Sequence, residues 1–194
     1  MRGWSAAGRS PEREETAMKA KRNPPRERAV TLRFVAEPAD ENLYGKVHGG
    51  AVMKWIDQAG YACATNWCAG ACVTVYVGGI RFYEPIQIGH LVEVQARLIH
   101  TGRTSMHVAV DVLSRDLRTR ESHATTHCVI VFVALGADGQ PVDVPPWRPR
   151  TKADRALEDY AKRRLELSRT LEVERRPWLA RAGEDSPGAF PENR

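Results

Sequence analysis

The sequence lacks any long apolar run. None of its 194 residues falls in a stretch close to the roughly 20 consecutive apolar positions that a membrane-spanning helix needs. A secretory leader also has a continuous apolar core, and no such core follows Met1 in the opening residues MRGWSAAGRSPEREE. We therefore expect neither a transmembrane helix nor a secretory signal.

Cysteine is also scarce, with only four in the chain: Cys63, Cys68, Cys72 and Cys128. No two of them form a CxxC pair, and no histidine stands beside them at zinc-finger spacing. This pattern argues against a disulfide framework and against a structural metal. Free thiols in a reducing compartment are the simplest interpretation, which favours a cytoplasmic location.

Charge of one sign is not absent but is modest. The net charge is +5 and the isoelectric point is near 9.2, so anionic partners such as phosphorylated cofactors or nucleic acid are the classes to consider. The positive charge concentrates in the two tails, where it serves solubility equally well, and we do not expect a nucleic-acid partner. Hydrophobic residues make up 42% and charged residues 27%, which is typical of a globular domain.

The composition divides the chain into three parts. Residues 1–28 are rich in Arg, Glu and Pro and are expected to be disordered. Residues 29–146 alternate between apolar and turn-forming stretches, as a folded domain does. Residues 147–194 form a C-terminal extension, with a helix expected over 151–176 and a loose end after Pro177.

Within the folded part, one helix stands among strands. Strands are expected at 29–36, 71–86, 90–102, 103–116 and 121–135, and the short turns between the last four favour an antiparallel meander. Residues 49–67 are apolar on nearly all sides, which predicts a buried helix that ends near Gly70. The predicted fold class is α+β, with one long helix wrapped by a curved antiparallel sheet. Such a sheet has open edges, so we expect a homodimer that pairs them.

Asp57 is the unusual residue of this helix. It stands mid-helix beside Trp55 and Ile56, and burial of an unpaired carboxylate costs several kcal/mol. One interpretation is a surface position or an ion pair, for example with Lys54. The other is a carboxylate held at an apolar cleft, where desolvation makes it a better base.

The entrance to the helix is the second candidate feature. His48, Gly49 and Gly50 directly precede or open it, and a helix N-terminus offers unpaired N–H groups that could bind an oxygen gaining negative charge. An ordinary glycine-rich helix start is the alternative. His48 is in addition a possible general base or hydrogen-bond donor.

Two further segments carry polar groups. Asn42, in the loop before the helix, could shape a turn or orient a water molecule. Arg103, Thr104 and Ser105 follow Gly102 between two strands and suit a phosphate, although a solvated hairpin turn is the simpler interpretation.

Taken together, these segments resemble the hotdog-fold acyl-CoA thioesterases over residues 29–146. The resemblance rests on four motifs in the family's order: Asn42-x-x-Gly45-x-x-His48-Gly49-Gly50 followed by Asp57; Thr74-Val75-x-Val77-x-x-Ile80-x-Phe82-x-x-Pro85-Ile86-x-x-Gly89; Gly102-Arg103-Thr104-Ser105; and Phe132-Val133-Ala134-Leu135 leading to Asp138-Gly139-Gln140-Pro141 and Val144-Pro145-Pro146. It implies hydrolysis of acyl-CoA to a free acid and coenzyme A. It also implies dimers with sites at the subunit interface, often assembled into hexamers.

The resemblance also implies roles for individual residues. Asp57 would be the base or nucleophile, and Asn42, from the partner chain, would help to place water or the thioester. Backbone N–H groups near Gly49 and Gly50, together with His48, would bind the thioester carbonyl. The final set contacts the nucleotide part of coenzyme A: Arg103, Thr104 and Ser105. No metal or cofactor is expected, since a thioester is already activated.

Two rival functions remain open at this point. A hotdog hydratase or dehydratase would act on enoyl thioesters, but that chemistry usually needs a helix histidine, and the helix after Gly50 has none. A regulator that binds acyl-CoA without cleaving it is the non-enzymatic alternative.

Overall fold

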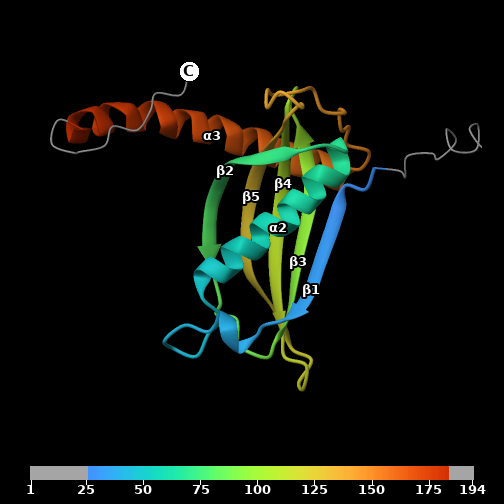
Figure 1. The fold of residues 1–194 in the computed structure, drawn as a ribbon, viewed down its shortest axis with the longest axis vertical. Coiled ribbons are helices and arrows are strands. Elements are labelled where there is room, and N and C mark those ends of the chain that lie inside the picture. Colours follow the sequence, from blue (N-terminus) through green and yellow to red (C-terminus); the bar gives the residue numbers. More distant parts are fainter. Residues whose placement is uncertain (1–25, 184–194) are drawn as a thin grey trace, which may run out of the picture.

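The computed structural model describes residues 26–183, so the predicted disorder of residues 1–25 and the loose end beyond 183 lie outside the described residues. Within this range the elements follow one another as shown in Figure 1: β1 (Ala29–Val35), the short 3-10 helix η1 (Pro38–Asp40), α2 (Gly49–Cys68), β2 (Cys72–Phe82), β3 (Leu91–Thr101), β4 (Ser105–Arg115), β5 (Ser122–Ala134) and α3 (Lys152–Gly183). The predicted helix and strands of the domain are confirmed to within a few residues. No helix in this range is both long and apolar enough to span a lipid bilayer.

The five strands form one antiparallel sheet in the order β1-β3-β4-β5-β2. The predicted simple meander is therefore wrong for β2, which pairs with β5 and not with its neighbour in sequence, β3. The reason lies in α2, which runs along one face of the sheet between β1 and β2 and delivers the chain to the opposite edge (Figure 1). Only β3, β4 and β5 are consecutive neighbours.

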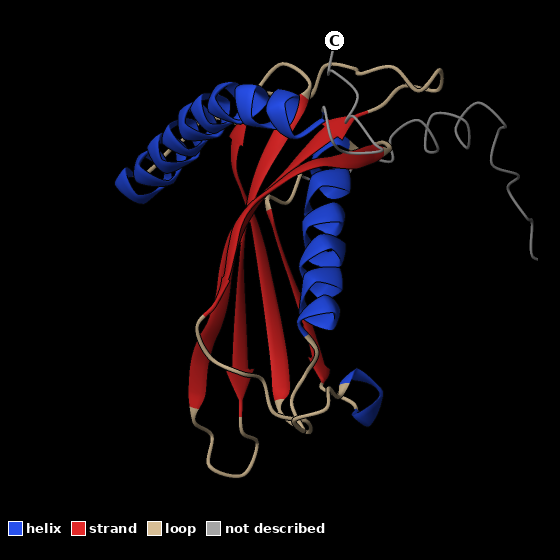
Figure 2. Ribbon diagram, turned by 90° about the vertical axis from the view of Figure 1, so that its left-hand side faces the viewer, coloured by secondary structure: helices blue, strands red, loops and turns tan. Residues whose placement is uncertain are grey.

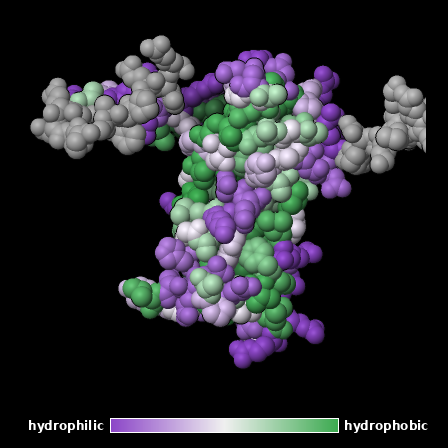
Figure 3. Space-filling model, in the orientation of Figure 1, coloured by the Kyte–Doolittle hydropathy of each residue, from purple (hydrophilic) through white to green (hydrophobic). Residues whose placement is uncertain are grey.

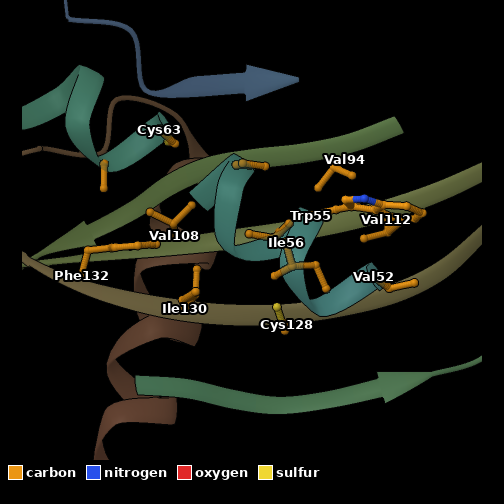
Figure 4. Packing of buried hydrophobic residues seen from close by; sticks show 14 of the residues in the cluster. Val52, Trp55, Ile56, Cys63, Val94, Val108, Val112, Cys128, Ile130 and Phe132 are labelled. Carbon is orange, nitrogen blue, oxygen red and sulfur yellow. The ribbon is translucent and has the colours of Figure 1, made fainter. Parts of the chain in front are cut away.

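The main core lies between α2 and the inner face of the sheet (Figure 4). Alternate residues of the three central strands face the helix, as a period of two requires; those without measurable exposure are Val92, Val94, Leu98, Met106, Val108, Val110, Val112, Cys128, Ile130 and Phe132. The helix answers with Val52, Ile56, Ala59 and Cys63. It approaches closely at Gly60, where an added Cβ would lie 2.9 Å from side-chain atoms of Ile130 and Phe132.

The C-terminal end of α2 also differs from the sequence expectation. Gly70 was the expected stop, but Ala69 adopts the left-handed conformation there, with φ 54° and its N–H bonded to the Thr65 carbonyl. A methyl group is the smallest side chain that pays this steric strain, and the capping bond offsets it.

The prediction that α2 is buried on all sides is wrong for a single chain. Met53, Asp57 and Tyr61 stand four residues apart on one stripe of the helix, and all three are exposed. The neighbouring edge strand β2 is apolar yet open, with Val73, Val75, Tyr76 and Val77 between 40% and 55% exposed. Figure 3 shows hydrophobic surface, broken by polar patches, on this face of the molecule. An all-apolar helix pattern reports burial, but not whether the same chain or a second one provides it.

Helix α3 covers the other face of the sheet (Figure 2). Its first turns place Leu157, Tyr160 and Ala161 against outward-facing residues of the central strands, namely Ile99, Ala109 and Val129. The buried Asp154 accepts a 2.5 Å hydrogen bond from Arg28, and this guanidinium holds the pKa of the carboxyl at about 2. The extension therefore does not cover the side on which α2 lies.

The distal part of α3 runs out beyond the sheet (Figures 1 and 2). The expectation that order ends at Pro177 is wrong, because the helix continues through this proline to Gly183. A proline removes one N–H donor and perturbs the preceding turn, but it does not by itself end a helix whose flanking residues are good helix formers.

His107 leads to a prediction about acid stability. It is 4% exposed on the outer face of the sheet, 5.2 Å from the ring of His100, which in turn contacts Glu158 of α3. Burial, reinforced by His100, lowers the pKa of His107 to about 4. Its folded pKa lies below its unfolded value, so stability is complete above about pH 6.5 and is lost as the pH falls toward 4. Between pH 7.5 and pH 5 this group should remove about 2 kcal/mol from the free energy of unfolding.

Urea titrations of the wild type and of His107→Gln at these two pH values measure the effect. The difference between the two pH values should shrink by about 2 kcal/mol in the variant. An equal difference in both proteins would show that His107 is not the titrating group.

Candidate functional site

A cleft of about 380 Å³ opens at the end of the sheet where α2 begins. Its walls come from the loop before α2, from the first turn of α2 and from the chain after β2. The inner part is apolar and closed, since Val47, Val52 and Ile86 are between 3% and 7% exposed. The rim is open and aromatic, with Tyr44 86% and Tyr83 62% exposed. A cleft with apolar walls and a few polar groups is the usual form of a small-molecule site.

His48 caps the helix that opens into this cleft. Its Nδ1 accepts a 2.9 Å hydrogen bond from the Gly50 N–H, and its backbone is extended, as an N-cap residue requires. Because Nδ1 is the acceptor, the proton of the neutral ring lies on Nε2, which is left as a donor. The expected pair of free N–H groups is therefore reduced to one. The Gly50 N–H is already bonded, whereas the Gly49 N–H has no partner among residues 26–183.

Asn42 lines the cleft and also builds the loop beside it. Its side-chain oxygen accepts hydrogen bonds from the N–H groups of Tyr44 and Lys46, at 2.8 and 3.2 Å. The turn closes at Gly45, whose φ of +70° favours glycine. The turn-forming role considered for Asn42 is thus confirmed. Since both bonded groups are donors, the oxygen is identified, and the amide Nδ2 remains a donor with a fixed orientation.

Asp57 lies outside the cleft, on the exposed stripe of α2. Eight residues of helix separate it from Gly49, which is about 12 Å along the axis. Its Oδ1 accepts a 2.6 Å hydrogen bond from Thr74 Oγ1 on β2. The ion pair with Lys54 that was considered is not present in the described part of the chain. The expected desolvation of this carboxylate is not present in one chain either, since the stripe faces solvent.

Thr74 is a site residue that the sequence did not single out. It lies 17 positions from Asp57, opposite Phe132 in the register of β2 and β5. The bond depends on how the edge strand crosses α2, and no local pattern encodes that crossing. Its only signal was membership of the Thr74-Val75 motif.

The predicted coenzyme A segment lies at the other end of the sheet. Ser105 pairs with Val133, and Val133 pairs with Val73 at the start of β2, whereas the cleft borders the end of β2. The segment is a hairpin turn, closed by the Gly102 N–H to the Ser105 carbonyl, as the simpler interpretation expected. The guanidinium of Arg103 is exposed and donates to Asp143 at 2.7 Å. One chain therefore does not bring this turn to the cleft.

Metal and thiol chemistry find no cluster to use in the described range. Across residues 26–183 no three His, Cys, Asp or Glu side chains gather to hold a metal ion. The four cysteines carry free thiols, and burial raises the pKa of Cys63 and of Cys128 to about 11. Such thiols are poor nucleophiles near neutral pH.

Comparison with known proteins decides the family. The thioesterase superfamily model matches residues 44–121, which include α2 and the strands that flank it. The acyl-CoA thioester hydrolase YciA of Salmonella typhimurium is 31% identical over 119 residues, which is 60% of this chain and 90% of the relative. The chain belongs to the thioesterase superfamily. Protein VdlD of Helicobacter pylori is also similar to this thioesterase, with 32% identity over 71% of this chain and 79% of the relative.

A solved structure extends the likeness to three dimensions. The crystal structure of an apo-hexameric acyl-CoA thioesterase is 32% identical, covers 76% of this chain and 96% of its own, and superposes with a TM-score of 0.73. The predicted hotdog fold and the predicted thioester hydrolase are therefore confirmed. The roles of individual residues in this thioesterase stay predictions.

Proposed function

We propose that this chain hydrolyses acyl-CoA to a free carboxylic acid and coenzyme A, at a site completed by a second copy of itself. The observation that carries the proposal is the placement of Asp57. Its carboxylate is oriented by Thr74 and lies on an exposed stripe between apolar residues, about 12 Å from the cleft and the Gly49 N–H. A carboxylate and an N–H so far apart cannot act on one carbonyl within one chain, but two copies can combine them. The names of the similar proteins, acyl-CoA thioester hydrolase and hexameric acyl-CoA thioesterase, support the same substrate.

The second copy would pair along β2 and the open stripe of α2. An apolar edge strand left unpaired is an aggregation hazard, and pairing with a second edge removes it. Burial of this stripe would also desolvate Asp57 and make it a stronger base. A dimer is thus the smallest active unit, and the hexamer of the similar solved structure supports a trimer of dimers.

In this site Asp57 would attack or activate. Thr74 occupies one carboxylate oxygen, so Oδ2 is left to take a proton from water or to attack the thioester directly and form an anhydride. Both routes remain open. The thioester carbonyl would lie at the Gly49 N–H, where the helix dipole favours developing negative charge. The Nε2–H of His48 and the Nδ2 of Asn42 are the nearby donors; Gly50 serves only to anchor His48.

The remaining parts of the proposal concern the rest of the substrate and its surroundings. The turn of Arg103, Thr104 and Ser105 would reach the nucleotide part of coenzyme A only from a neighbouring chain, because it lies at the far end of the sheet. The reaction needs no metal or cofactor, since the thioester is already activated. We place the enzyme in the cytoplasm, in keeping with its free thiols.

Thiol release from a panel of acyl-CoA esters tests the proposal. We expect the wild type to release coenzyme A with a kcat/KM of at least about 10⁴ M⁻¹s⁻¹ for its best substrate, within the usual range of enzymes. Crotonyl-CoA separates this function from a hydratase, which would consume the enoyl absorbance without releasing thiol. Tight binding of every ester without thiol release would instead indicate a regulator.

A further inference from the structure

Thr126 on β5 carries a buried hydroxyl that nothing in the proposed mechanism uses. It lines the cleft and is 3% exposed, and its Oγ1 has no hydrogen-bond partner among residues 26–183. Its neighbour Thr125 is equally buried, but that hydroxyl donates to the Val112 carbonyl at 3.0 Å. Buried polar groups in proteins are almost always bonded, so the hydroxyl of Thr126 calls for a partner from outside the described chain.

The surroundings of this hydroxyl indicate what kind of group would reach it. Thr126 lies in register with Phe82 and Val112, on the face of the sheet that packs against α2. The cleft residues around it that are equally buried, Val52 and Ile86, are apolar. An apolar chain that enters from the open aromatic rim would thus meet a single polar atom at the closed end.

The thioester carbonyl itself belongs nearer the rim. The Gly49 backbone is half-buried, and an added Cβ there would contact the ring of Phe82, which is 50% exposed. The carbonyl would therefore stay at the helix start, while the acyl group extends inward toward the buried end and Thr126. Distance from the carbonyl distinguishes this hydroxyl from the donors already assigned to it.

We infer that Thr126 selects acyl groups that carry an oxygen on the chain, namely hydroxyacyl or oxoacyl thioesters. A threonine hydroxyl both donates and accepts, so it satisfies either oxygen. A plain acyl chain would fill the same space but leave the buried hydroxyl unpaired, and sites built to bond an oxygen discriminate against such analogues. This inference rests on the proposed hydrolysis of acyl-CoA and adds its substrate class.

The test compares 3-hydroxybutyryl-CoA with butyryl-CoA in three proteins. In the wild type the kcat/KM for the hydroxyacyl ester should exceed that for the plain ester about 10-fold. Thr126→Val keeps the shape but removes the hydroxyl, and should bring this ratio close to one. Thr126→Ser keeps the hydroxyl and should retain the preference. An unchanged ratio in Thr126→Val would overturn the inference, and so would an equal loss for both esters, because that would place the hydroxyl at the carbonyl.

Thermal stability separates this outcome from failure of the proposed function. Without ligand, Thr126→Val should melt at or above the wild-type temperature, since a methyl group replaces an unpaired buried hydroxyl. If the wild type hydrolyses neither ester, the proposed function fails, and ligand-induced shifts in Tm still test Thr126. The hydroxyacyl ester should then raise the Tm of the wild type more than butyryl-CoA does, and equally in Thr126→Val; equal shifts in the wild type would reject the inference.

Discussion

Replacing Asp57 by Asn is expected to lower kcat for thioester hydrolysis by about 10³-fold or more, which is the usual loss when a general base or nucleophile is removed. The amide has the size of the carboxylate and keeps an oxygen for the Thr74 hydroxyl, so the contact between α2 and β2 survives. What it loses is the ability to take a proton or to attack a carbonyl. Because the side chain is exposed in one chain, its replacement should leave the fold and the Tm almost unchanged.

The measurement is thiol release under saturating acyl-CoA, with circular dichroism and Tm as checks on folding. Asp159→Asn provides the matched control, since it makes the same acid-to-amide change at an exposed position on α3, on the other face of the sheet. That control should keep wild-type turnover. Turnover in Asp57→Asn within about 10-fold of the wild type would remove Asp57 from the mechanism.

How much of this site the sequence could predict depends on how local each feature is. The start of α2, the cap at His48 and the turn at Asn42 all depend on neighbouring residues, and their positions agree with the motif. The bond between His48 and Gly50 is just as local, but a glycine pair alone does not reveal that one of its two N–H groups is occupied. Local patterns fixed where the site begins, and left its free donors undetermined.

Features that depend on distant contacts were missed for a common physical reason. The partner of β2 is β5, reached only after two further strands, and the bond from Thr74 to Asp57 follows from that placement. Alternation in a strand says which residues share a face but not which strand lies beside it. The unpaired hydroxyl of Thr126 is invisible in sequence for the same reason, since its isolation is a property of the packed cleft.

The open stripe of α2 is the most informative of these differences. Its residues are apolar enough to predict burial, yet one chain leaves Met53 and Tyr61 nearly half exposed beside Asp57. The sequence pattern therefore describes the assembled protein, whereas the single chain describes one component of it. A stripe that is apolar except for one carboxylate is consistent with an interface that surrounds a reacting group.

The second large effect is expected at Asn42, where two substitutions separate a loop role from a chemical one. Asn42→Asp keeps an oxygen to accept from the N–H groups of Tyr44 and Lys46, so the turn should persist. It replaces the amide donor Nδ2 by a second oxygen. If that donor holds the thioester or the attacking water, kcat/KM should fall about 10²-fold, as when one donor of an oxyanion site is lost.

Asn42→Ala removes the donor and the acceptor together. It should show a similar loss of kcat/KM and, in addition, a fall of about 1 kcal/mol in the free energy of unfolding, since two backbone N–H groups lose their partner. Steady-state kinetics and urea titrations of both variants measure the two effects separately. A fully active Asn42→Asp beside an impaired Asn42→Ala would mean that Asn42 only shapes the loop, and the donor to the substrate would then have to come from His48 or the Gly49 N–H.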